Sequence, residues 1–344
     1  MATTIKDIAN ACHVSKATVS RYINGSGYVS AEVAAKIATK IREMNYVPSA
    51  TARNLSNRKN NVIGVVIPEV SNPFFGEVFK GISQIAEEHN LNIFYCDTDN
   101  SAEKEMKALA MLRSYEIQGI ILTPAAGGMY KKRPSQEFID GVKALNVPVI
   151  LLDRDVPYVN WDGVFIDNYR GAYESTKCLI EAGHTEIATI AGDLSLMIGR
   201  ERLRGYTEAM QAHGLQVREE LIYPGDFTTK TAYNIMIDII DSDNRPTAIF
   251  SPNNLTTLGI LQGIFQKGLR IPEDIAIVGV DDIDVLTTLH INLTVIKRDN
   301  IKMGIEAMNL LYARMNETEN AVNTEPLRIV MEPEIIYRGS EKKM

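Results

Sequence analysis

The stretch Thr4-Ile-Lys-Asp-Ile-Ala-Asn-Ala-Cys-His-Val-Ser-Lys-Ala-Thr-Val-Ser-Arg-Tyr-Ile23 has the pattern of two short helices joined by a tight turn. Thr4 and Asp7 have the spacing of a capping box, with Asp in place of Glu or Gln, which predicts the start of the first helix. Ser15 is expected to cap a second helix over residues 16–23, which Asn24-Gly25 ends. A third helix is predicted over residues 31–44, behind a cap at Ser30. The pattern indicates a helix-turn-helix.

The apolar residues of these helices recur at helical spacing and predict one small core. Its expected members are Ile5, Ile8, Ala9, Ala11, Val19, Ile23, Val33, Ile37 and Ile41. The opposite face of the second helix carries Lys16, Ala17, Thr18, Ser20 and Arg21. Short or cationic side chains can approach phosphates and base edges, and an arginine can make two bonds to guanine. This face is therefore a candidate DNA-contacting surface.

Charge is distributed unevenly along the chain. Residues 1–60 contain nine Lys or Arg and three Asp or Glu, a formal charge of +6, and the remainder carries −13. A basic segment at one end of an acidic protein favours a polyanionic partner for that end only.

From residue 61 onward, short apolar runs alternate with amphipathic stretches. Strands are predicted over residues 62–67, 92–96, 119–122, 147–152, 163–166, 186–190, 248–250 and 275–280. Helices are expected between them, for example over residues 75–89, 103–115, 169–182 and 203–213. Continuous apolar strands joined by helices are typical of doubly wound parallel sheets, whose ligands bind at the carboxyl ends of the strands.

The motifs of several other protein classes are missing from the sequence. No Gly-rich phosphate-binding loop follows the first predicted strand, and no Gly-Lys-Ser/Thr loop occurs. The five histidines have no Ser or Cys partner in a hydrolase pattern, so we expect no enzyme, no catalytic residues and no cofactor. Three widely spaced cysteines, Cys12, Cys96 and Cys178, indicate neither a disulfide framework nor a metal site. The first residues lack an apolar signal segment and no run is long enough to span a membrane, which predicts a cytoplasmic protein.

Several of these segments resemble the lactose/galactose repressor (LacI/GalR) family. Residues 4–9, 14–21, 24–25 and 29–30 resemble its DNA-binding headpiece, and Asn45-Tyr-Val-Pro-Ser-Ala-Thr-Ala-Arg-Asn-Leu55 resembles its hinge. The resemblance implies that a hinge leucine of each subunit, here Leu55, wedges into the minor groove and kinks the DNA. The small, polar residues 49–56 offer too little apolar surface to hold a helix alone, so order should come with DNA and a partner subunit.

By this resemblance the headpiece is residues 1–48, the hinge 49–60, and the effector-binding and dimerisation domain 61–340. The residues expected to contact DNA are Thr4, Ser15, Lys16, Ala17, Thr18, Arg21, Asn24, Tyr46, Ala52, Asn54 and Leu55.

The remainder resembles the family's sensor, a two-lobed α/β domain similar to periplasmic sugar-binding proteins. The chain is then expected to cross between lobes three times. By analogy, lobe one comprises residues 61–160 and 292–322, and lobe two comprises 161–291 and 323–340.

The resemblance also implies a set of effector contacts, most of them at strand ends. They are Asn72, Phe74, Phe75, Asp153, Arg154, Asp167, Arg202, Phe227, Asn253 and Asp281. Carboxylates and an arginine suit vicinal hydroxyls, and aromatic faces suit the apolar side of a sugar ring. Leu196 and Ile198 stand where purine-binding relatives carry an arginine and a threonine, which disfavours a purine. Arg154 and Arg202 leave a sugar, a sugar acid or a phosphosugar open.

The sequence thus predicts a sequence-specific transcription regulator of carbohydrate genes, most simply a repressor. It should bind a pseudo-palindromic double-stranded DNA operator as a homodimer, under the control of a small effector. One alternative is a catabolite-control regulator whose main signal is a phosphorylated carrier protein. A solute-binding protein shares the lobes but would need a signal peptide and no headpiece.

Overall fold

The computed structural model describes residues 3–46, 60–125, 129–130, 133–317 and 325–344. The chain divides into two compact units between Asn60 and Asn61. Residues 49–59 of the predicted hinge lie outside the described residues, and Ala52, Asn54 and Leu55 are among them.

The first unit contains the three predicted helices, α1 (Ile5–Cys12), α2 (Lys16–Asn24) and α3 (Ala31–Glu43). The Thr4–Asp7 capping box is present in both directions, and Ser15 and Ser30 cap α2 and α3. Ile8, Ala9, Cys12, Val19 and Ile37 form the buried core. The helix-turn-helix prediction is confirmed.

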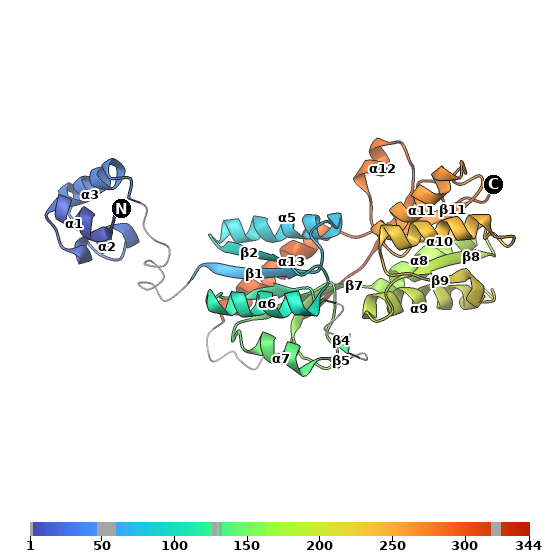
Figure 1. Ribbon diagram of the computed structural model, residues 1–344, viewed down its shortest axis with the longest axis horizontal. Coiled ribbons are helices and arrows are strands. Elements are labelled where there is room, and N and C mark those ends of the chain that lie inside the picture. The colour runs from blue at the N-terminus through green and yellow to red at the C-terminus, as the bar shows by residue number, and fades with distance from the viewer. Residues whose placement is uncertain (1–2, 47–59, 126–128, 131–132, 318–324) are drawn as a thin grey trace. The chain divides into compact units, whose positions relative to one another are not determined.

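The second unit contains two six-stranded sheets, each in its own lobe (Figure 1). In order, the first sheet is β13 (Arg328–Met331), β7 (Asp162–Ile166), β6 (Val149–Leu152), β3 (Ile120–Leu122), β1 (Val62–Ile67) and β2 (Asn92–Asp97). The second sheet is β14 (Glu334–Ile336), β12 (Thr294–Lys297), β11 (Ala276–Val280), β10 (Ala248–Phe250), β8 (Ile187–Ala191) and β9 (Ile222–Pro224). A short pair, β4 (Met129–Tyr130) and β5 (Arg133–Pro134), lies outside both.

All eight predicted strands are present, with ends shifted by two residues at most. Every pairing in the two large sheets is parallel except that of β14 with β12. The exception follows from the chain path: β12 leaves lobe two at its carboxyl end, whereas β14 enters lobe two at its amino end. The two strands therefore run in opposite directions.

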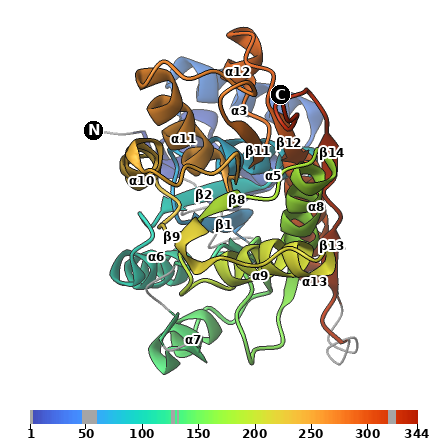
Figure 2. The same cartoon turned by 90° about the vertical axis from the view of Figure 1, so that its right-hand side faces the viewer.

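Helices cover both faces of each sheet, as a doubly wound fold requires. On the first sheet, α5 (Pro73–Glu88) and α13 (Asn300–Met315) pack on one face, and α6 (Ala102–Ser114) and α7 (Gln136–Lys143) on the other. On the second, α8 (Asn168–Glu181) and α9 (Met197–Ala212) oppose α10 (Thr229–Asp241) and α11 (Asn254–Gln266) (Figure 2). Two short helices, η2 (Glu219–Leu221) and α12 (Asp284–Thr288), complete lobe two. No helix among the described residues is long and apolar enough to cross a membrane.

The predicted lobe boundaries are wrong at all three crossings. Strand β7 belongs to the first sheet although residues 161–291 were assigned to lobe two, and β12 belongs to the second although 292–322 were assigned to lobe one. Strand β13 is likewise in the first sheet, not in lobe two. In each case the predicted boundary precedes a strand, whereas the chain crosses to the other lobe only after the carboxyl end of that strand has reached the cleft.

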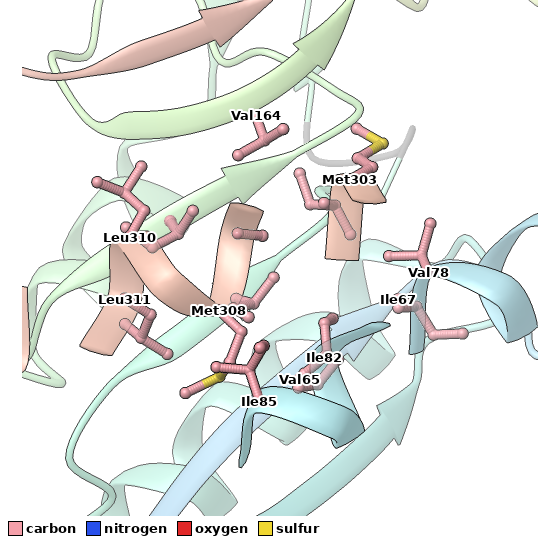
Figure 3. Packing of buried hydrophobic residues seen from close by; sticks show 14 of the residues in the cluster. Val65, Ile67, Val78, Ile82, Ile85, Val164, Met303, Met308, Leu310 and Leu311 are labelled. Atoms are coloured by element: carbon pink, nitrogen blue, oxygen red, sulfur yellow. The ribbon is translucent and has the colours of Figure 1, made fainter. Parts of the chain in front are cut away.

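Helices α5 and α13 are joined by a close backbone contact at two glycines. Val78, Ile82 and Ile85 of α5 face Met303, Met308 and the two leucines Leu310 and Leu311 of α13 over the sheet (Figure 3). A Cβ at Gly304 would stand 2.0 Å from the Val78 carbonyl oxygen, and one at Gly81 would stand 2.0 Å from the Ile301 carbonyl oxygen. Only glycine permits this approach.

We expect Gly304→Ala to destabilise the protein by about 3 kcal/mol, because the added methyl group must push the two helices apart. The matched control is Gly76→Ala, also in a helix of this pair but exposed and with open space around its Cβ. There the better helix propensity of alanine should stabilise by about 0.5–1 kcal/mol. Urea denaturation of both variants measures the difference; equal midpoints would contradict the close-contact argument.

Candidate functional site

A cavity of about 250 Å³ lies between the two lobes, at the carboxyl ends of the strands. Eight strands (β1, β2, β6, β8, β9, β10, β11 and β12) place a lining residue within three positions of their last residue. Its lining comprises Pro68, Glu69, Asn72, Phe74, Phe75, Asp99, Asn100, Asp153, Arg154, Asp193, Leu196, Ile198, Arg202, Asp226, Phe227, Thr228, Asn253, Asn254, Leu255, Asp281 and Arg298. The cavity is where a doubly wound fold binds its ligand.

Nine of the ten predicted effector residues line this cavity, and Asp167 does not. Asp167 instead caps α8, where its Oδ1 accepts a hydrogen bond from the Arg170 amide at 2.8 Å. Asp167 is at the start of lobe two, as predicted. A carboxylate at this position can also accept a hydrogen bond from a free backbone amide at the start of a helix. Leu196 and Ile198, the positions that disfavour a purine, both line the cavity.

The most connected residue of the cavity, Arg298, is absent from the sequence-based set. Its guanidinium is buried, donates from Nε and Nη2 to the two carboxylate oxygens of Asp281, and has Nη1 3.5 Å from Asp153 Oδ1. It also covers the Phe74 ring at 4.3 Å from the ring centre. Burial by itself would lower the pKa of Arg298, but Asp281 and then Asp153 raise it above the usual value. Recognising β12 as a strand would have placed Arg298 at a strand end.

Arg202 is a buried cation with a different environment. Its Nε donates to Asn168 Oδ1 at 2.9 Å and its Nη1 to the Pro252 carbonyl oxygen. Among the described residues no carboxylate oxygen lies within 4 Å of its guanidinium nitrogens. Burial, and then the charge of Arg298, lower its pKa to about 10, so it remains charged at neutral pH. A buried charge held only by neutral acceptors can bind additional oxygen atoms of a ligand.

Arg154 ties together three strand ends of lobe one. Its Nη1 donates to Asn100 Oδ1 at 2.7 Å, beyond β2, and to the Pro124 carbonyl oxygen at 2.9 Å, beyond β3. Burial lowers its pKa, against the opposing charges of Asp153 and Glu105. Arg154 therefore supports the wall of the cavity as well as lining it.

Asp153 offers the cavity an unused acceptor. It is 6% exposed, and its Oδ1 accepts no hydrogen bond among the described residues. Its backbone is left-handed, with φ of 61°, as are those of Phe227 and Asp281 at 68° and 72°. Such conformations cost of order 1–3 kcal/mol each and cluster at ligand sites, where surrounding contacts hold them.

One side-chain hydrogen bond links the lobes directly across the cavity. Asn254 Nδ2, in lobe two, donates to Asn72 Oδ1 in lobe one at 2.9 Å. The same Asn72 oxygen accepts from the Phe74 amide and so caps α5. The relative position of the lobes is thus coupled to residues that line the cavity.

The candidate DNA-contacting face lies on the first unit, on the side of α2 opposite Val19. Of the residues expected to contact DNA, Thr4, Ser15, Lys16, Ala17 and Arg21 are exposed, and Thr18 and Tyr46 are partly buried. Asn24 is the last residue of α2. No carboxylate of the described residues pairs with Lys16 or Arg21, so both charges face solvent.

Arg298→Met should lower the free energy of unfolding by about 3–5 kcal/mol, because it leaves Asp281 and Asp153 buried without their cation. The matched control is Arg338→Met, since Arg338 also makes two bonds to one carboxylate, Asp282, but in a more exposed pair. Its loss should cost about 1 kcal/mol. Denaturant unfolding measures both; equal losses would contradict the role of burial.

Glu105 should give the protein a distinctive pH dependence. It is buried, its Oε1 accepts from the Ala125 amide at 2.7 Å, and burial raises its pKa from 4.5 to about 7. Because the folded state then binds this proton more tightly than the unfolded state, the stabilisation is complete below about pH 4.5 and is lost as pH rises through 7.

Between pH 5 and 8 this group alone should reduce the stability of the wild-type protein by about 2.5 kcal/mol. Glu105→Gln keeps an acceptor for the Ala125 amide and should lose the part of the pH dependence that comes from Glu105. Urea midpoints of the wild type and the variant at pH 5 and pH 8 test this. Subtracting the pH dependence of the variant from that of the wild type cancels the contributions of the other titrating groups. Parallel pH dependences would refute it.

Two family models match the chain, and between them they cover both units. Residues 4–49 match "Bacterial regulatory proteins, lacI family", and residues 60–332 match "Periplasmic binding proteins and sugar binding domain of LacI family".

Three individual proteins show the same relationship over nearly the full length. The chain is 32% identical over 340 residues to the HTH-type transcriptional repressor PurR of Pasteurella multocida, covering 98% of each chain. It is also 32% identical to the HTH-type transcriptional regulator DegA of Bacillus subtilis, covering 99% of this chain and 98% of the relative. The structure of the transcriptional regulator CelR–cellobiose complex superimposes with a TM-score of 0.72 at 29% identity, covering 98% and 99% of the two chains.

All three relatives are transcription regulators by name, and the matched family models cover the helix-turn-helix and the two-lobed domain alike. The chain therefore belongs to the LacI family and is a DNA-binding transcription regulator.

Proposed function

We propose that this regulator is a repressor controlled by an uncharged, sugar-like effector that binds in the cavity between its lobes. The observation that carries this proposal is that Asp153, Asp281, Arg202 and aromatic side chains, which come from both lobes, line the same cavity. Carboxylates and guanidinium groups bind vicinal hydroxyls, and Phe74 and Phe227 can cover ring carbons.

The charge of the cavity favours an uncharged effector over a sugar acid or a phosphosugar. Six carboxylates line it, those of Glu69, Asp99, Asp153, Asp193, Asp226 and Asp281, against three arginines. Arg298 is neutralised by Asp281, and Arg154 already donates to protein oxygens. An anion would meet this excess negative charge, and the two arginines without a carboxylate partner among the described residues, Arg154 and Arg202, already donate to neutral oxygens of the protein.

DNA binding by the headpiece is proposed to use the expected residues of α2 and its flanks, with Lys16, Ala17 and Arg21 reading bases. A homodimer places two such helices in successive major grooves of a pseudo-palindromic operator. The hinge residues Ala52, Asn54 and Leu55 supply the minor-groove contacts, with Leu55 as the wedge. Effector binding changes the angle between lobes, and so the spacing of the hinges.

The decisive experiment titrates the full-length protein with a duplex that it selects from a random-sequence pool. Titrations are run without ligand and with glucose, galactose, ribose and cellobiose, and with the uronic acids or phosphates of these sugars. At least one uncharged sugar should raise the melting temperature and change operator Kd by about fivefold or more. A charged form acting more strongly than its neutral parent would contradict the charge argument. If no sugar changes the melting temperature or the operator Kd, the result would favour the alternative in which a phosphorylated carrier protein is the main signal.

In the same titrations Leu55→Ala should weaken operator binding at least about tenfold, because the wedge that bends the DNA is lost. Its melting-temperature shift with the active sugar should equal that of the wild type, since the effector cavity is untouched. Unchanged operator affinity would refute the wedge.

A further inference from the structure

A second cavity of about 240 Å³ adjoins the first, and Asp153 and Ile198 line both. It is built where the chain crosses between the lobes: Ile166 ends β7, Val330 lies on β13, and Met197 and Glu201 lie on the first turns of α9. We call it the annex. Its walls come from both lobes, as do those of the main cavity.

The annex has the same mixture of chemistry as the main cavity. Asp155 Oδ2 forms an ion pair with Arg328 Nη2 at 2.6 Å, while the other oxygen, Oδ1, is buried and accepts no hydrogen bond in the described chain. The Arg328 guanidinium lies over the Phe165 ring at 4.5 Å from its centre. An unused carboxylate oxygen beside apolar and aromatic surface suits a ring that carries hydroxyl groups.

The two cavities share a lining residue, Asp153, that has unmet hydrogen-bonding capacity. Asp153 is buried and lines both spaces, and its Oδ1 accepts no hydrogen bond among the described residues, with Arg298 Nη1 3.5 Å away. Small-molecule sites usually measure roughly 300–1,000 Å³, so the main cavity alone falls below this range whereas the two together fall inside it.

We infer that the effector site extends past Asp153 and Ile198 into the annex, and that the effector is a saccharide of two units, one in each cavity. This inference rests on the proposed function and adds to it the size of the ligand. Asp153 accepts hydroxyl groups close to the linkage, and Asp155 accepts those of the second unit.

The test compares dissociation constants of full-length protein for cellobiose, maltose, lactose, melibiose, trehalose and sucrose with those for glucose, galactose and fructose. Val330→Trp fills the annex from a side chain that is 57% exposed and should fold normally. Leu327→Trp is the matched control, because Leu327 is 51% exposed, precedes the same strand and lines neither cavity.

At least one disaccharide should bind about tenfold or more tightly than either of its units. Val330→Trp should remove that advantage and leave the binding of the single unit unchanged, and Leu327→Trp should alter neither. A monosaccharide that binds as tightly as every disaccharide overturns the inference and leaves the proposed function standing. A disaccharide preference that survives Val330→Trp also overturns it, because the second unit then lies elsewhere. If no sugar of either size binds, the proposed function fails and this inference fails with it.

Discussion

The guanidinium of Arg298 sits at the second crossing between the lobes, between a carboxylate of lobe one and a carboxylate of lobe two. Asp281 holds it with two hydrogen bonds, and Asp153 lies 3.5 Å away. All three groups are buried, so removing one of them would leave an uncompensated charge in the interior. The cation contacts the side chains of two residues with left-handed backbone, Asp153 and Asp281, and covers one face of Phe74. The floor of the cavity depends on this cluster.

The same arrangement explains how one cavity can sense a ligand and move two lobes. Its residues follow strands of both sheets, and the Asn72–Asn254 hydrogen bond spans the cleft beside them. A ligand that satisfies Asp153 and Arg202 at once must contact both lobes, so its binding energy depends on the angle between them. This differential contact is the requirement for a ligand to shift a conformational equilibrium.

Sequence patterns located most of the elements that carry this site. Eight strands were predicted because buried parallel strands are continuous apolar runs, and nine of ten expected effector residues line the cavity. Arg298 is not among the predicted residues because β12, Thr294–Lys297, is short and has polar ends. The apolar pattern therefore does not predict a strand that ends just before Arg298. Asp167 caps α8 and lines the annex, not the main cavity; a polar residue after a strand has the same local pattern whether it faces a ligand or caps a helix.

The sequence by itself determined the helix-turn-helix, the doubly wound fold class and the residue types at the strand ends. These depend on local signals: capping residues, helical spacing and apolar runs. The tertiary structure decided which strands pair in which sheet, where the chain crosses between lobes, and which charges meet. Pairing of Arg298 with Asp153 and Asp281 joins residues far apart in the chain, and the shared wall of the two cavities joins different elements. Such contacts depend on packing in three dimensions, which no local pattern encodes.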